Sequence, residues 1–474
     1  MASYYFWILI AGLAVTLAVT LFKPERIYEY PFFMAAAFMV FIVPQAVSLM
    51  RFPGAAGEEQ IARVLLMCCL CFGMCWAGYS LKPVQFLNRT LARPVNLDRL
   101  FHGGLVFIAV SYFFNHLISQ MTEEQTGGSQ WTGPVTIYGF FAGLIYPAFA
   151  ICLFTAFRTN GWLAWFCVVV AAIQPLQASV LAGRRETTVL FLLTLALTLY
   201  YYRGIKPPRL AIVFSVLSAM LIIPATGTYR SIAAERDWEQ IGQMDLVGNF
   251  EYYLNSESIL ELRNAALVME ATRLAGEYQY GAAYWDQLVF RFIPAQLVGK
   301  GLKDSLMFQP SDEHLKAELA KLGYDVPGGS TLTGMADAFQ QFGWFGCIFF
   351  AGMGLLFKTL FRATQAPNPI FAQLFYILTA TSAMRAITHQ TIDFLPGLVY
   401  YTIFLGLLWL YVRLPEMKSF GSHVETLKTE ILEAESGRRR MKVAPFSVTA
   451  PENETRKTEE SRLSSEVGSL TSDL

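Results

Sequence analysis

The sequence predicts an all-α polytopic membrane protein with about 11 transmembrane helices and one large, mostly helical external loop. The first reason is composition, since the 474 residues are 54% hydrophobic and only 15% charged, whereas a soluble protein normally carries about 25% charged residues. The second reason is that the apolar residues gather in runs of about 16 to 22, the length that a helix needs to cross the hydrocarbon core. Because a helix satisfies its backbone hydrogen bonds within one segment, such runs fold as membrane-spanning helices.

Eleven apolar runs are the predicted spans. In chain order they cover about residues 4–22, 31–50, 61–80, 100–119, 135–157, 162–182, 187–202, 210–226, 343–361, 369–388 and 394–412. The first run has no basic region before it and no cleavage site after it, so we expect a retained span and not a signal peptide. The run at 187–202 is short, and residues 280–298 stay open between a loop segment and a re-entrant or interfacial helix.

The basic residues fix the orientation, because cytoplasmic connections carry the excess of lysine and arginine. Six connections agree, and their basic residues are Lys23 and Arg26; Lys82, Arg89, Arg93 and Arg99; Arg158; Arg203, Lys206 and Arg209; Lys358 and Arg362; and, after Arg413, Lys418, Lys428, Arg438, Arg439, Arg440 and Lys442. We therefore expect these connections and the C-terminus in the cytoplasm, and the N-terminus outside. The 120–134 connection has Glu123 and Glu124 and no basic residue, as expected of an external connection.

This topology divides the chain into four parts. Spans one to eight occupy residues 1–226, the external loop 227–342, spans nine to eleven 343–412, and a cytoplasmic tail 413–474. Within the loop, residues 251–275 have apolar residues at helical spacing, and Ser311 caps a short helix over 311–322. The tail contains too few apolar residues to fold alone and is expected to be largely disordered.

Two external connections are rich in arginine, against the general rule. Arg184 and Arg185 lie at the mouth of the seventh span, and the large loop presents five arginines before its first lysine: Arg230, Arg236, Arg263, Arg273 and Arg291. Arginine in preference to lysine indicates bidentate contacts with carboxylate or phosphate. For the loop arginines two interpretations stay open, an anionic ligand or pairing with the acidic residues of the loop itself.

A further charged group lies near the external end of the tenth span. Arg385 is followed at i+4 by His389, on the same helix face, and Asp393 begins the last span. Charges at membrane depth are costly and are functional by default, although Arg385 could only snorkel to the headgroups and His389 could be a solvated helix end. Together, Arg385, Arg184, Arg185 and the loop arginines predict a cationic site at the outer lipid boundary, suited to a lipid-linked diphosphate sugar.

Several other kinds of chemistry lack their signatures. There is no Walker loop, no HExxH, no two CxxC motifs that could pair, no DxD and no GxSxG elbow, so neither a cofactor nor a metal is expected. The seven cysteines all fall within apolar runs and are expected to act as small apolar residues. The zero formal net charge gives no indication of nucleic acid, because the charge is segregated by loop.

Three stretches, in this order, resemble the oligosaccharide repeat-unit polymerases, the family of O-antigen and exopolysaccharide polymerases. They are Ala182-Gly183-Arg184-Arg185-Glu186, then Arg291-Phe292-Ile293-Pro294, then GGSTLTGMADAFQQFGWFG with Gly328, Gly329, Ser330, Thr331, Gly334, Asp337, Phe342, Gly343 and Gly346. The resemblance covers about residues 100–412, lies in order and context more than in strict motif, and is most specific in the third stretch. The family can have a long loop between the sixth and seventh spans, and here that connection is very short.

The resemblance implies an inverting, metal-independent glycosyl transfer at the periplasmic face of a bacterial inner membrane. A glycan leaves its undecaprenyl diphosphate and joins a hydroxyl of an incoming lipid-linked repeat unit, while arginines stabilise the leaving diphosphate and a base takes the hydroxyl proton. The expected residues are Arg184, Arg185, Arg230, Arg291 and Arg385 for the diphosphate, His389 and Asp337 as candidate bases, and Gly329, Gly334, Gly343 and Gly346 in the loop motif. The implied partners are undecaprenyl-diphosphate-linked oligosaccharide, membrane lipids, a chain-length regulator and a flippase.

Two alternatives remain. A ligase of the O-antigen type would share the charge layout and differ in its acceptor. A lipid-linked oligosaccharide flippase or transporter belongs to a different class, and it should keep polar residues through the depth of several helices. Here the middle of the membrane is almost wholly apolar, and charge collects at the outer rim.

Overall fold

The computed structural model describes residues 1–414 apart from 122–133, 257–259 and 329, and it does not describe 415–474. The predicted tail and most of the 120–134 connection therefore lie outside the described residues. In the described part all regular structure is helical except for one isolated bridge between Val95 and Arg413. This confirms the all-α class.

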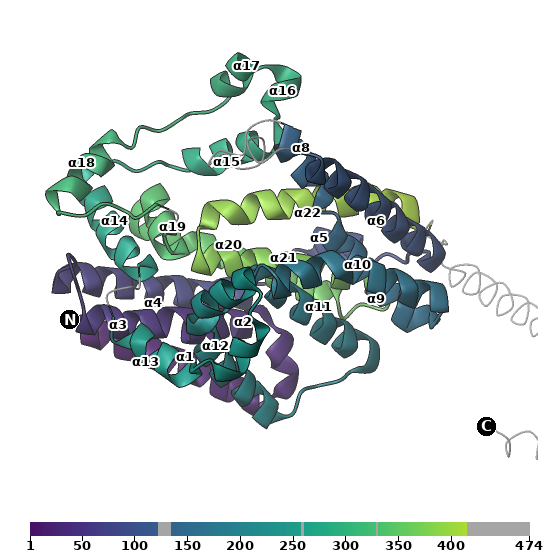
Figure 1. Ribbon diagram of the computed structural model, residues 1–474, viewed down its shortest axis with the longest axis horizontal. Helices are drawn as coiled ribbons and strands as arrows, with labels where there is room; N and C mark the ends of the chain where they lie inside the picture. The colour runs from purple at the N-terminus through teal and green to yellow at the C-terminus, as the bar shows by residue number, and fades with distance from the viewer. Residues whose placement is uncertain (122–133, 257–259, 329, 415–474) are drawn as a thin grey trace, which may run out of the picture. The chain divides into compact units, whose positions relative to one another are not determined.

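The first half of the chain forms both long and short helices. They are α1 (Ala2–Phe22), η1 (Pro24–Tyr28), α2 (Tyr30–Ala37), η2 (Phe38–Ile42), α3 (Val43–Arg51), α4 (Glu58–Ser80), α5 (Gln85–Leu91), α6 (Leu97–Ser119), α8 (Pro134–Ala142), α9 (Ile145–Thr159), α10 (Trp162–Val180), α11 (Arg185–Arg203) and α12 (Arg209–Glu235). Figure 1 shows their long axes roughly aligned in one bundle.

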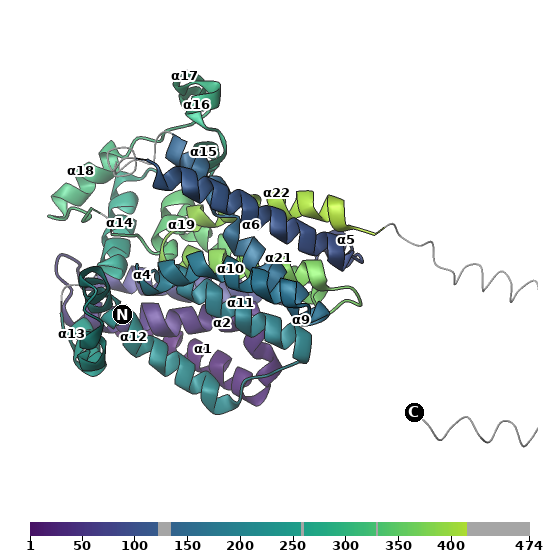
Figure 2. The ribbon, with the colours of Figure 1, turned by 45° about the vertical axis from the view of Figure 1, so that its right-hand side comes forward.

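The second half begins with short helices and ends with long ones. The short ones are η3 (Trp238–Gln243), α13 (Leu246–Leu254), α14 (Glu261–Ala275), α15 (Ala282–Phe292), α16 (Ala295–Val298), α17 (Lys300–Ser305), α18 (Glu313–Lys321), α19 (Gly334–Phe342) and η4 (Gly343–Cys347). The bundle is completed by α20 (Ile348–Ala363), α21 (Ile370–Thr388), η5 (Thr391–Asp393) and α22 (Phe394–Val412). In both ribbon views α16 and α17 stand away from the bundle (Figures 1 and 2).

Ten helical stretches of the described residues are long and apolar enough to cross a membrane, so the chain is a multi-pass membrane protein. Several predicted boundaries were wrong. The eighth helix continues to Glu235 and not to 226, and the predicted helix over 251–275 is interrupted between α13 and α14. The predicted run at 135–157 is two helices, α8 and α9, with a break at Gly143 and Leu144.

The predicted run at 187–202 is helix α11, which is not one of the ten stretches. Its 19 residues begin with Arg185 and Glu186 and end in three tyrosines and Arg203, which lowers its mean hydropathy. It nevertheless extends along α21 in the opposite direction. Glu186 pairs with Arg385 near the end of α21, and Tyr200 stacks on Tyr28, whose backbone oxygen accepts a hydrogen bond from Tyr376 near the start of α21.

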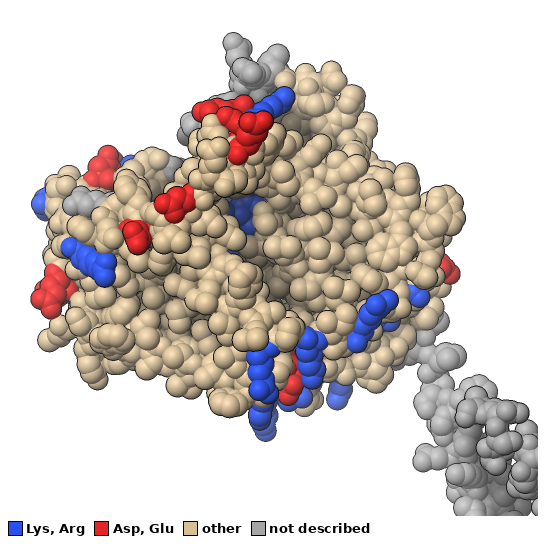
Figure 3. All heavy atoms as spheres, turned by 60° about the horizontal axis from the view of Figure 1, so that its bottom comes forward, with Lys and Arg blue, Asp and Glu red and all other residues tan. Residues whose placement is uncertain are grey.

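The basic connections meet at one end of the bundle. Lys206 pairs with Glu25 at 3.2 Å, Val95 forms its bridge with Arg413, and the backbone nitrogen of Val84 donates to the hydroxyl of Thr359. The N-terminus and the end of α22 lie at opposite ends in both ribbon views (Figures 1 and 2). On the face in Figure 3, lysine and arginine side chains gather along one edge.

Small residues allow a close backbone contact between α4 and α20. A Cβ on Gly78 would lie 1.9 Å from the backbone oxygen of Ala351, and one on Gly354 would lie 2.3 Å from that of Cys75. Lipid tails are as apolar as the side chains, so the hydrophobic effect does not drive helices together inside a membrane. Close backbone packing of this kind stabilises their association instead. Helix α20 also packs against α21, which is buried around most of its surface at the centre of the bundle.

Helix α14 belongs to the predicted external loop but is largely buried. Every residue from Leu262 to Thr272 is buried. Its Glu270 forms ion pairs with Arg63 of α4 and with Arg273, so for Arg273 the pairing of loop arginines with loop carboxylates is confirmed. This anchored helix packs against α18 and α19.

Candidate functional site

A groove of about 360 Å³ joins a polar end to long apolar walls. At the polar end, called the head end below, lie Arg185, Glu186, Arg385, Thr388 and His389. The walls come from α2 with η2 and from α12, and they include Phe32, Ala36, Val40, Phe41, Ile212, Val216, Ala219 and Ile223. Figure 3 shows a hollow near the middle of one face, with basic atoms in its depth.

The turn before α11 is built by the end of α12. The hydroxyl of Tyr229 donates to the backbone oxygen of Val180 at 2.7 Å, and Nε of Arg230 donates to that of Gly183 at 3.2 Å. Gly183 has a φ of +56°, and a Cβ there would lie 2.8 Å from the side chain of Arg230. Glycine is therefore required, and Arg230 holds the turn instead of lining the groove.

The two adjacent arginines have different surroundings. Arg185 is the first residue of α11 and lines the head end of the groove. Arg184 precedes the helix and lies outside the groove lining; the two arginines are both exposed, so their place relative to the groove is what differs. Because the helix turns by about 100° per residue, neighbours at a helix start point in different directions.

Arg385 is the centre of a chain of alternating charges. Its Nη1 lies 3.5 Å from Glu186 and its Nη2 3.5 Å from Asp393. Asp393 is also 3.7 Å from Nη2 of Arg291 and accepts a hydrogen bond from the side-chain amide of Gln287 at 3.3 Å. The long distances describe loose pairs, in which an incoming anion could replace either carboxylate on Arg385.

His389 follows the last residue of α21 and faces the same end of the groove. Its Nδ1 lies 2.9 Å from the hydroxyl of Thr388. Burial lowers the pKa of His389 below its ordinary value of 6.5, and the positive charges of Arg385 and Arg185 lower it further, against the opposing effect of Asp393. The imidazole is therefore neutral at pH 7 and able to accept a proton.

Asp337 lies behind the head end and not in it. It is only 2% exposed. Its carboxylate accepts hydrogen bonds from the hydroxyl of Thr391 and, at 3.0 Å, from the backbone nitrogen of Ile392. Tyr284 of α15 reaches the same Thr391 hydroxyl at 2.7 Å. This geometry suits a residue that positions the turn after His389, and of the two candidate bases only His389 lines the groove.

The loop glycines hold α19 and η4 against their neighbours. A Cβ on Gly334 would lie 1.7 Å from the backbone oxygen of Ala386, and one on Gly346 would lie 2.0 Å from that of Ala338. Gly343 has a φ of +59°. The predicted role of Gly329 lies outside the described residues.

The structure thus brings two of the five predicted arginines into the groove, Arg185 and Arg385, and links Arg291 to them through Asp393. The sequence analysis left two acidic residues out of the candidate site, Glu186 and Asp393. Their signal was their place beside Arg185 and at i+8 from Arg385, which could have been read as charge pairing across two helix ends.

Within the described residues, no group of three or more His, Cys, Asp and Glu side chains could hold a metal ion. Comparisons with protein-family models, with curated proteins and with solved structures find no match.

Proposed function

We propose that the chain polymerises undecaprenyl-diphosphate-linked oligosaccharide repeat units into a surface polysaccharide by inverting glycosyl transfer. The observation that supports the proposal is the groove itself. It combines two arginines with a long apolar channel between α12 and η2, as a ligand with an anionic head and a hydrocarbon tail requires. Arginine forks match phosphate oxygens, and the apolar walls match a prenyl chain.

In the proposed reaction, the groove binds the donor with its diphosphate at Arg185 and Arg385. An acceptor hydroxyl attacks the anomeric carbon, the bond from that carbon to the diphosphate oxygen breaks, and the diphosphate leaves with the electron pair. The arginines stabilise the negative charge that develops on it. The neutral imidazole of His389 takes the hydroxyl proton, and Asp337 keeps the turn after His389 in place through Thr391 and Ile392.

The proposal includes a topology of eleven crossings. Helix α11 is the crossing that the hydropathy of the chain leaves open, and its antiparallel course along α21 supports it. The basic connections at one end of the bundle then lie in the cytoplasm, and the head end faces the periplasm of a bacterial inner membrane. A chain-length regulator and a flippase are the proposed protein partners.

Deletion of the gene, followed by gel analysis of the glycans, tests the proposal. A polymerase should leave single repeat units on the lipid or its core acceptor. Polymer retained on undecaprenyl diphosphate would instead indicate a ligase, and intermediates that face the cytoplasm would indicate a flippase. An unchanged surface glycan would refute all three.

A further inference from the structure

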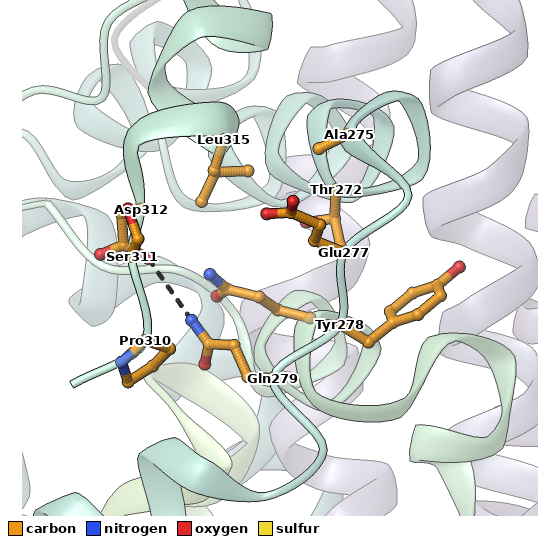
Figure 4. A pocket seen from close by; sticks show the side chains of 10 residues that line it. Thr272, Ala275, Glu277, Tyr278, Gln279, Pro310, Ser311, Asp312 and Leu315 are labelled. Atoms are coloured by element: carbon orange, nitrogen blue, oxygen red, sulfur yellow. Dashed lines mark hydrogen bonds between the residues drawn. The ribbon is translucent and has the colours of Figure 1, made fainter. Parts of the chain in front are cut away.

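A second cavity, of about 240 Å³, lies outside the groove, among the short helices of the predicted external loop. Figure 4 shows it between the end of α14, the irregular segment 277–279 and the start of α18. Helix α19 contributes Gln340. None of these residues belongs to the head end, and the proposed function leaves the cavity unused.

The carboxylates of the cavity are Glu277 and Asp312, its carboxamides are Gln279 and Gln340, and the hydroxyls of Thr272 and Ser311 also line it. Gln279 donates to Asp312 over 3.4 Å, a long hydrogen bond. The side chains of Glu277 and Gln340 have no hydrogen bond to other described residues. In Figure 4 the ring of Tyr278 points away from the cavity centre.

This combination matches the hydroxyl groups of a sugar. Each sugar hydroxyl both donates and accepts, carboxylates accept, and carboxamides do both. The side chains of Ala275, Pro310 and Leu315 add apolar surface for C–H groups. The lining contains two carboxylates and no lysine or arginine. Its negative charge therefore repels a phosphate or a uronic acid.

Helix α19 connects the cavity to the head end. Asp337 fixes the turn at Thr391 and Ile392 that follows His389. Gln340, three residues further along the same helix, lines the cavity, a rise of about 5 Å. The neighbouring Gln341 accepts a hydrogen bond from the backbone nitrogen of Gly281 and so holds the 277–281 segment on α19.

We infer that this cavity binds a neutral sugar residue of the glycan whose diphosphate lies at the head end. The inference rests on the proposed function for the identity of that glycan, and on the cavity alone for the class of ligand. The sugar subsite selects uncharged sugar residues. It binds the glycan by hydrogen bonds while the transfer takes place at the head end, which α19 connects to the cavity.

The test is saturation-transfer NMR on the full-length chain in lipid nanodiscs, with seven separate probes. Six are neutral, namely glucose, galactose, mannose, rhamnose, N-acetylglucosamine and N-acetylgalactosamine, and the seventh is glucuronate. We expect transfer to at least one neutral sugar, weaker transfer to glucuronate, and a loss of about fivefold or more in Glu277→Gln and in Gln340→Ala. Glu313→Gln makes the same change of charge on α18 outside the cavity and should keep the signal.

No transfer to any neutral sugar, or equal transfer in Glu277→Gln and Glu313→Gln, would overturn the inference, as would a signal that disappears with EDTA and reports a bound cation. The Arg185→Ala variant should keep sugar binding, because the head end is separate. Sugar binding in a chain whose deletion leaves the surface glycan unchanged would refute the proposed function only. Loss of polymer on deletion without sugar binding would refute the subsite only.

Discussion

Arg184 and Arg185 are adjacent in the sequence, but only Arg185 lines the groove. We expect Arg185→Ala to reduce the amount of polymer by about 100-fold, on the order of the loss when one preorganised donor is removed from a developing oxyanion. Arg184→Ala should reduce it far less and is the matched control. Glycan gels of the two strains, normalised to the amount of protein in the membrane, give the comparison.

Arg185→Lys separates charge from geometry at the same position. A lysine keeps the positive charge and loses the planar fork, so we expect it to restore only part of the activity. Full activity in Arg185→Ala, or equal losses in the Arg184 and Arg185 variants, would contradict the assignment of Arg185 to the diphosphate.

His389 predicts the pH dependence of transfer. A base must be neutral, and the pKa of His389 is below 6.5, so the rate should be constant above about pH 7 and fall as the pH drops through the lowered pKa. Among the charged neighbours, Arg385 has the largest effect on the pKa of His389, and it lowers that pKa. The Arg385→Gln variant should therefore show the acid limb of its residual activity at higher pH.

The measurement is the initial rate of transfer on purified lipid-linked repeat units from pH 5 to pH 8. His389→Gln should lose about 100-fold of the rate together with the acid limb. Thr388→Ala removes the hydroxyl at Nδ1 and should leave the limb in place with a smaller loss. An unchanged profile in His389→Gln would exclude His389 as the base.

The sequence predicted the residue types of the site better than their roles. Arg385 and His389 were found from charge near a span end, because such charges are rare at membrane depth. It could not be predicted that Arg185 lines the groove while Arg230 holds a turn. Nor could it be predicted that His389 lines the groove while Asp337 lies behind it. Which side chain enters the groove depends on how the ends of α11, α12 and α21 meet, and no local pattern encodes that meeting.

At the scale of elements, the loop glycines are contact residues between α19 and its neighbours. Gly334→Ala would place a methyl group against the backbone oxygen of Ala386, 1.7 Å from the added carbon. Relief needs a shift of α19 from α21, so we expect a loss of about 1–3 kcal/mol in the free energy of unfolding. A Cβ on Gly328 would have no atom within 4 Å, so Gly328→Ala is the control from the same stretch.

Thermal unfolding in detergent, followed by size-exclusion chromatography, measures both variants. Gly334→Ala should unfold at a lower temperature than the parent, and Gly328→Ala should match the parent. Equal unfolding temperatures for all three proteins would show that α19 does not depend on this contact.

Element boundaries were predictable only where hydropathy changes abruptly. The turn before α11 was found because Gly183 and two arginines interrupt an apolar run. The extension of α12 to Glu235 was missed, because its last turns are polar and are held by tertiary hydrogen bonds from Tyr229 and Arg230. Burial of α14 was missed for a related reason, since its Glu270 is compensated by Arg63, far away in sequence.

At the scale of the whole molecule, the distribution of basic residues predicted which connections lie together. The contacts between Lys206 and Glu25 and between Val95 and Arg413 join connections that the sequence analysis had placed on one side. Of the eleven predicted crossings, α11 is the one that is not among the ten long apolar stretches of the described residues. Charged residues and tyrosines at its ends lower its mean hydropathy. Its 19 residues nevertheless form about 28 Å of helix, close to the thickness of the hydrocarbon core.

Labelling of single cysteines decides whether α11 crosses. In a background without the seven native cysteines, Ala182→Cys precedes α11, Lys206→Cys follows it, and Lys82→Cys lies in another basic connection. With a crossing, a membrane-impermeant maleimide added to spheroplasts should label Ala182→Cys, whereas Lys206→Cys and Lys82→Cys should react only after permeabilisation. Without a crossing, Ala182→Cys and Lys206→Cys would react under the same condition. The head end would then lose its place opposite the basic connections, and the proposed periplasmic transfer would fall with it.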